Sequence, residues 1–186
     1  MGHTPAMTGT HNLSDTELHA LSLDGLVWRE GSLYGSGPRP PLLAERATLI
    51  AARLPDWAIG AGHTAGWVWT GLGRPEPWSV MCAKQPALSP MLRSVWKPRA
   101  RELHSSDVVS LRGLTLLSPR RTVTDLLVCP GADEVAAAQI FELTTAEGLE
   151  EAAGSLGSIP PRLRERLRLR RAVVNQWWRD YPVVTR

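Results

Sequence analysis

The chain has 186 residues, 43% of them hydrophobic and 21% charged, which is the composition of a globular protein and excludes an intrinsically disordered one. Its 21 basic and 18 acidic residues give a net charge of +3, which permits contact with nucleic acid without requiring it. The sequence contains no apolar run long enough to cross a membrane and no signal-peptide pattern at its start. It therefore predicts a cytoplasmic protein without a membrane partner, and residues 1–12 are expected to be a disordered leader.

The cysteines, basic residues and tryptophans further limit the possible classes of protein. Cys82 and Cys129 lie in apolar segments without metal-ligand spacing, so neither a disulfide framework nor a zinc site is predicted. Nineteen of the 21 basic residues are arginine, a bias that a GC-rich coding sequence would also produce. Five of the eight tryptophans gather in the middle of the chain and predict a tryptophan-rich core: Trp57, Trp67, Trp69, Trp78 and Trp96.

A short helix and a hairpin are expected near the start of the chain. The sequence SDTE at 14–17 has the pattern of a capping box and predicts a helix through residue 23. Residues 26–29 and 32–35 predict two short strands around a tight turn. Because a helix followed by a small hairpin is typical of the last third of a winged helix, residues 13–36 are predicted to be a partial winged-helix element.

The proline-rich residues 37–41 predict a stiff linker into a helix from Leu42 to Arg53. Residues 57–59 and 78–83 predict short strands, with a helix over 65–71 between them that is capped by His63 or Thr64. His63 has no second potential ligand one helical turn away and is interpreted as a capping or core group. In the helix from Leu42 to Arg53, apolar residues recur at helical spacing. Its charged residues are expected to face solvent: Glu45, Arg46 and Arg53.

Residues 92–103 carry four cations against one carboxylate, Glu102. Trp96, which lies among them, is either a platform for a base or sugar or a buried anchor. The cations of this segment are candidate phosphate contacts: Arg93, Lys97, Arg99 and Arg101.

Residues 103–127 give the clearest local pattern. An apolar run, a turn at Arg112-Gly113 and the strand-like residues 114–117 predict a hairpin, and Ser118-Pro119 predicts the start of a helix. Arg120 and Arg121 lie in the first turn of that helix, where the helix dipole disfavours cations, so we expect them to have an acidic or phosphate partner. Asp125, four residues after Arg121, is the nearest candidate.

The rest of the chain predicts three helices. One covers 132–143, and a second capping-box pattern from Thr144 to Glu147 starts another that runs through residue 153. The last helix, from Arg162 to about Trp178, is amphipathic and basic, and its arginine side chains are expected to be exposed on the protein surface. They either bind phosphate or an acidic partner, or form a solvated face. The domain boundaries predicted are 42–158 for a core domain and 159–186 for a basic helix and tail.

Two stretches resemble a known family: GHTAGWVWTGLG at 62–73 and DVVSLRGLTLLSPRRTVTDLL at 107–127. From about Leu13 to about Leu149 the chain resembles AbiEi-type antitoxins, transcriptional regulators of type IV toxin–antitoxin systems that are common in actinobacteria. The full family has a complete winged helix, whereas its first two helices are expected to be missing here. The residues that carry the resemblance are His63, Thr64, Ser118, Pro119, Arg121, Thr122 and Asp125.

The order of the predicted elements indicates an α/β domain with helices around a small mixed sheet. The sequence contains no catalytic or metal-binding constellation, so no catalytic activity, metal or cofactor is expected. The resemblance implies a DNA-binding regulator. In the family, antitoxins repress their own promoter and counter a nucleotidyltransferase toxin without a stable complex. The alternatives are a protein-interaction module that has lost DNA binding and a degenerate nuclease-related fragment. Candidate DNA contacts are Thr16, His19, Ser22, Arg29, Arg93, Lys97, Arg99, Arg101, Arg162, Arg164, Arg166 and Arg168.

Overall fold

A mixed five-stranded sheet forms the base of the computed structural model, which describes residues 14–24, 26–30, 33–36, 42–75, 77–82, 89–91, 96 and 98–180. The strand order is β5-β4-β3-β7-β6, with β3 parallel to β7, β4 parallel to β5 and the other neighbours antiparallel. The α/β class predicted from the sequence is therefore confirmed. The strands are β3 (Ile59–Gly60), β4 (Val80–Cys82), β5 (Arg99–Ala100), β6 (Val108–Leu111) and β7 (Leu114–Leu117).

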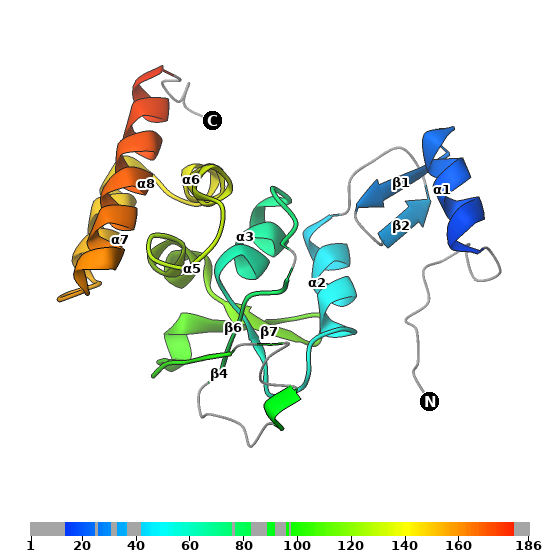
Figure 1. Ribbon diagram of the computed structural model, residues 1–186, viewed down its shortest axis with the longest axis horizontal. Coiled ribbons are helices and arrows are strands. Elements are labelled where there is room, and N and C mark those ends of the chain that lie inside the picture. Colours follow the sequence, from blue (N-terminus) through cyan, green and yellow to red (C-terminus); the bar gives the residue numbers. More distant parts are fainter. Residues whose placement is uncertain are drawn as a thin grey trace.

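The helices α2 (Leu43–Ala51), α3 (Gly62–Thr70) and α5 (Pro119–Leu126) lie on the same side of this sheet (Figure 1). Beyond them, α6 (Asp133–Leu143), α7 (Ala146–Gly154) and α8 (Pro161–Asp180) extend the helical layer away from the sheet (Figure 1). Packing of α8 on α6 and α7 makes the basic C-terminal helix part of this layer. The helix of 161–180 is longer than expected at both ends.

The expected helix and hairpin near the start are confirmed as α1 (Asp15–Leu23), β1 (Val27–Glu30) and β2 (Leu33–Ser36). The Glu17 carboxylate accepts a hydrogen bond from the Ser14 backbone N–H at 2.7 Å, and Ser14 Oγ accepts one from the Glu17 N–H at 3.3 Å. These two bonds form the predicted capping box. The expected leader at 1–12, the linker at 37–41 and the tail at 181–186 lie outside the described residues.

The predicted hairpin and capped helix of residues 108–126 are also confirmed. Arg112 and Gly113 both have positive φ, 51° and 80°, as a two-residue hairpin turn requires. Ser118 is the N-cap of α5 and its side chain accepts a hydrogen bond from the Arg121 N–H, while Pro119 occupies the first turn. A short 3₁₀ turn, η1 (Ser105–Asp107), precedes β6.

Gly113 and Gly154 offer a matched pair of glycine-to-alanine substitutions. A Cβ meets nothing within 4 Å at either position, so only the backbone decides the result. Gly113→Ala is expected to lower the free energy of unfolding by about 1 kcal/mol because an L-residue is strained at φ 80°. Gly154→Ala is expected to raise it by up to about 1 kcal/mol because Gly154 ends α7 without a positive φ. Urea unfolding midpoints test this, and shifts of the same sign would contradict it.

The apolar residues pack into two main clusters. Trp67 is fully buried in the first, between α2, α3 and the sheet, and the other four central tryptophans are partly buried against it, which confirms the tryptophan-rich core. The second cluster joins α5, α6, α7 and α8 around residues such as Leu126, Ile140 and Val174. Trp96 is partly buried and packs against the first cluster.

Four expectations about local structure were wrong. The N-cap of α3 is Ala61, so His63 and Thr64 lie inside the first turn, and α7 is capped by Thr145 rather than Thr144. Arg46 does not face solvent: it is buried and donates from Nε to the Val68 carbonyl at 2.9 Å, near the end of α3. Arg170 is not exposed on the surface either: it is fully buried between α8 and α5.

Candidate functional site

A small basic cavity lies where α8 begins. Its volume is about 220 Å³, and Arg101, Arg121 and Leu163 are among the residues that line it. Arg101 is exposed just after β5, Arg121 comes from the first turn of α5 and Leu163 from α8. We call this the α8-start cavity; its lining residues are Met81, Arg101, Arg121, Thr124, Asp125, Val128, Ser155, Leu156, Ser158, Ile159, Pro160 and Leu163.

Arg121 is held in place but only weakly neutralised. Its nearest carboxylate is that of Asp107, with 3.8 Å between Nη1 and Oδ2, and not that of Asp125 as predicted. Its Nε–H is buried and has no hydrogen-bond partner among the described residues. The part of the Arg121 side chain that lines the cavity can contact an oxygen of a phosphate group.

Asp125 instead forms a bidentate ion pair with Arg99. Both distances are 2.7 Å, from Arg99 Nη1 to Oδ1 and from Nη2 to Oδ2. The Asp125 side chain is 5% exposed and that of Arg99 is 27% exposed. The predicted Arg121–Asp125 bridge is thus corrected, and Arg99 joins the sheet edge to α5 instead of facing solvent as an unpaired phosphate contact.

The predicted arginines of α8 differ in how they are engaged. Arg166 donates to the Val128 carbonyl at 3.2 Å, and Val128 lines the α8-start cavity. Arg164 donates to the carbonyl of Ile159, which lines the same cavity, at 3.0 Å. Arg168 is paired with Glu165 at 2.7 Å, and Arg162 is exposed. The structure therefore brings Arg101, Arg164 and Arg166 to one region.

The neighbouring helix α7 neutralises the middle of α8 and the start of α5. Glu150 pairs with Arg171, and Glu151 pairs with Arg120 at 2.5 Å. Arg120 and Arg121 thus have acidic partners, as expected for cations at a helix start, but from other elements. Arg162 and Arg164 in the first turn of α8, and Arg101 beside the α8-start cavity, form no ion pair with another described residue.

No described contact places the remaining predicted DNA-binding residues beside the α8-start cavity. Thr16 is exposed on α1, where His19 and Ser22 also lie, and Arg29 lies on β1. The orientation of these last three side chains is outside the described part of the structure. Arg93 and Lys97 likewise lie outside the described residues.

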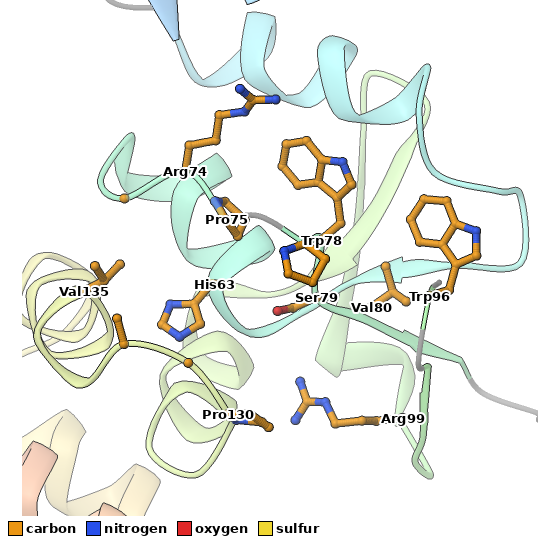
Figure 2. A pocket seen from close by; sticks show the side chains of 14 residues that line it. His63, Arg74, Pro75, Trp78, Ser79, Val80, Trp96, Arg99, Pro130 and Val135 are labelled. Carbon is orange, nitrogen blue, oxygen red and sulfur yellow. The ribbon is translucent and has the colours of Figure 1, made fainter. Parts of the chain in front are cut away.

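A larger pocket, of about 660 Å³, opens between α3, the segment after it, and the start of α6 (Figure 2). We call it the tryptophan pocket. Its apolar walls include Trp78, Trp96 and three prolines, and its polar residues include His63, Ser79 and Arg99. The lining residues are His63, Gly73, Arg74, Pro75, Pro77, Trp78, Ser79, Val80, Trp96, Arg99, Pro130, Gly131, Ala132 and Val135.

His63 forms part of the pocket wall and is held by Gln139. Gln139 Nε2 donates to the Leu72 carbonyl at 2.8 Å, so the Gln139 Oε1 faces His63 Nδ1, 3.3 Å away, and accepts a hydrogen bond from the Nδ1–H. The other ring nitrogen of His63, Nε2, has no hydrogen-bond partner in the described part of the chain and faces Gly131, where a Cβ would approach it to 2.1 Å. Burial lowers the pKa of His63, and the positive charge of Arg170 lowers it further, so His63 is neutral at pH 7.

The thiol behind this pocket is unreactive at neutral pH. Burial raises the pKa of Cys129 to about 11, and the negative charge of Asp125 also raises it. A thiol with that pKa carries almost no thiolate at pH 7. Within the described ranges, no three His, Cys, Asp or Glu side chains lie close enough together to hold a metal ion.

Comparison with known proteins gives no match: no protein family, no curated protein and no solved structure is significantly similar to this chain. Among the described residues, no helix is long and apolar enough to cross a membrane.

Sequence reasoning found the arginines of α8 but missed both cavities. Arg121 was assigned to a structural pair, and its position beside Arg101 depends on how α5 packs against the sheet edge. The tryptophan pocket brings together residues that are far apart in the chain: 63, 73–75, 77–80, 96, 99, 130–132 and 135. The cluster of tryptophan, proline and arginine at 74–78 was the only local signal for it.

Proposed function

We propose that this protein is a cytoplasmic DNA-binding transcriptional regulator that acts as the antitoxin of a type IV toxin–antitoxin system. The single observation that carries the DNA-binding part is the gathering of Arg101, Arg121 and Arg166 around the α8-start cavity. The antitoxin assignment comes from the resemblance of residues 62–73 and 107–127 to AbiEi-type antitoxins.

Arg101, Arg121 and Arg166 would bind the backbone phosphates of DNA. Three elements distant in sequence supply them, so the phosphates of a duplex would meet a fixed set of donors rather than one flexible arm. Arg121 lines the cavity, and Arg162 and Arg164 extend the cationic surface along α8. Such contacts hold a protein on DNA but do not read its sequence.

Reading of the promoter sequence is assigned to the helix–hairpin element. Thr16, His19 and Ser22 lie on α1, and Arg29 lies on β1. In a winged helix, a helix enters the major groove while the hairpin contacts the backbone. Repression of its own promoter and antagonism of a nucleotidyltransferase toxin without a stable complex would then follow the family pattern.

Replacing Arg101 and Arg162 by alanine tests the phosphate-binding surface. We expect the double variant to bind a duplex more weakly and to reduce the slope of log K against log salt by about two, since each lost phosphate contact removes about one. Fluorescence anisotropy of a labelled duplex at several salt concentrations measures both quantities.

The matched control is Arg112→Ala with Arg179→Ala, which removes the same charge from the β6–β7 turn and from the far end of α8. Its affinity and salt slope are expected to stay close to those of the wild type. If both double variants lost the same slope, only net charge would matter, and the α8-start cavity would not be the interface.

A protein-interaction module is the second candidate, because α8 also exposes apolar side chains. Leu169 and Val173, one helical turn apart, are 45% and 37% exposed. A partner that packs on this stripe would bind with little dependence on salt, in contrast to DNA. The same anisotropy titration therefore separates the two candidates.

A further inference from the structure

We propose that the tryptophan pocket binds a small organic anion with a flat apolar ring. The proposal is independent of DNA binding, because the pocket shares only Arg99 and Trp96 with the 92–103 segment and none of its lining residues belongs to α8. A volume of about 660 Å³ lies within the range of pockets that take small molecules.

Arg99 is the anchor for the charged group. Two of the five guanidinium N–H groups of Arg99 donate to Asp125, which fixes the plane of the guanidinium. The other N–H groups of Arg99 have no partner among the described residues. Its guanidinium points across the pocket toward His63 and Pro130 (Figure 2). Because Asp125 already holds this side chain in place, a ligand would lose little entropy in ordering it.

Asp125 balances the charge of Arg99, but the described lining offers hydrogen-bond donors and no carboxylate to a ligand, which favours an anion over a cation. The described lining residues include Arg74 and Arg99 and no aspartate or glutamate. His63 is neutral, for the reasons given above, so it neither adds to the positive charge nor cancels it. The Ser79 side chain, which lines the pocket between His63 and Val80, is a further donor for an oxygen of the ligand (Figure 2).

The aromatic and proline walls suit the ring of such a ligand. The Trp78 ring is already oriented by two neighbours, Trp67 at 6.1 Å between ring centroids and the Arg74 guanidinium at 5.2 Å. Pro75 and Trp78 lie above His63, and Pro130 lies below it, in the view of Figure 2. Flat apolar surfaces of this kind stack on an aromatic ring or on a nucleobase.

The anionic group can be a carboxylate or a phosphate, and two pairs of probes distinguish them. Calorimetric titration with 2-naphthoate is compared with its uncharged carboxamide, and titration with AMP is compared with adenosine. We expect at least one of the anions to bind with one site per chain and about tenfold more tightly than its uncharged partner. Which pair shows the difference identifies the anionic group.

Two variants assign this binding to the pocket. Ala132 is exposed, lines the pocket and makes no side-chain cap bond, so Ala132→Trp fills the pocket without changing the core. We expect it to abolish binding, whereas Glu134→Trp, an exposed neighbour that does not line the pocket, leaves binding unchanged. Arg99→Lys keeps a charge for Asp125 but loses the planar fork and is expected to weaken the anion and not the uncharged compound.

Three results would overturn the proposal. The first is that neither anion binds at concentrations up to about 1 mM. The second is equal affinity for the charged and uncharged compounds. The third is wild-type affinity in folded Ala132→Trp or, if that variant does not fold, in Arg99→Lys.

Discussion

Replacing Arg170 by methionine is expected to lower the free energy of unfolding by about 3–5 kcal/mol, since two buried carbonyls lose their donor and each such loss costs about 1–3 kcal/mol. Arg170 is fully buried, and its guanidinium donates to the carbonyls of Leu126 and Cys129 at the end of α5. Methionine fills much of the space but leaves these carbonyls without their donor, and a buried unpaired carbonyl is costly. The Asp133 partner adds less, because its side chain is 52% exposed and water can replace the arginine.

Arg168→Met is the matched control on the same helix. Arg168 is 75% exposed and pairs with Glu165, so its loss is expected to leave the free energy of unfolding nearly unchanged. Urea unfolding followed by circular dichroism measures both variants. Equal effects of the two substitutions would mean that Arg170 does not hold the end of α5.

The second large effect is expected for Asp125→Ala, which should lower the free energy of unfolding by about 2–4 kcal/mol. The substitution leaves Arg99 with an uncompensated charge at the junction of β5 and α5. The value lies slightly below that for a fully buried pair, because the Arg99 side chain is 27% exposed and is partly solvated. Glu165→Ala, which breaks an exposed ion pair, is the control and should leave the free energy of unfolding nearly unchanged.

A double-mutant cycle separates the pairing from the cost of an unpaired charge. Arg99→Met in the Asp125→Ala background is expected to recover part of the lost stability, since it removes the unpaired guanidinium. Additive losses in the double variant would show that the two side chains do not interact energetically, contrary to their 2.7 Å contacts.

The sequence predicted local structure best where one short segment decides it. The β6–β7 turn at Arg112-Gly113 and the Ser118 cap of α5 each depend on backbone preferences of one or two residues, and both are confirmed. The capping box of α1 is a further example. These features are visible without knowing what packs above them.

Arginine pairing could not be predicted in the same way, because a long side chain can reach partners from distant elements. Asp125 lies one turn from Arg121 but pairs with Arg99, which is 26 residues away. Proximity in the chain favoured the wrong partner. The assignment of Arg99 as an exposed phosphate contact failed for the same reason.

The burial of Arg170, in contrast, left a signal in the sequence. The apolar positions Leu163, Leu167 and Val174 recur at helical spacing, and residue 170 falls on the same stripe. Arg46 lies likewise three residues after Leu43 and one before the buried Ala47. Both buried arginines bind carbonyls at the end of another helix, where a cation is favoured by the helix dipole.

The most direct measurement of the central claim is the anisotropy of a labelled duplex from the gene's own promoter, titrated with the protein at two salt concentrations and against a scrambled duplex. The account predicts promoter-preferring binding that weakens steeply as salt rises. Equal and weak binding to both duplexes would mean that the arginines contact phosphates without recognising the promoter, so the protein would not be a transcriptional regulator. Absence of binding at low salt would contradict the account and leave the interaction module in its place.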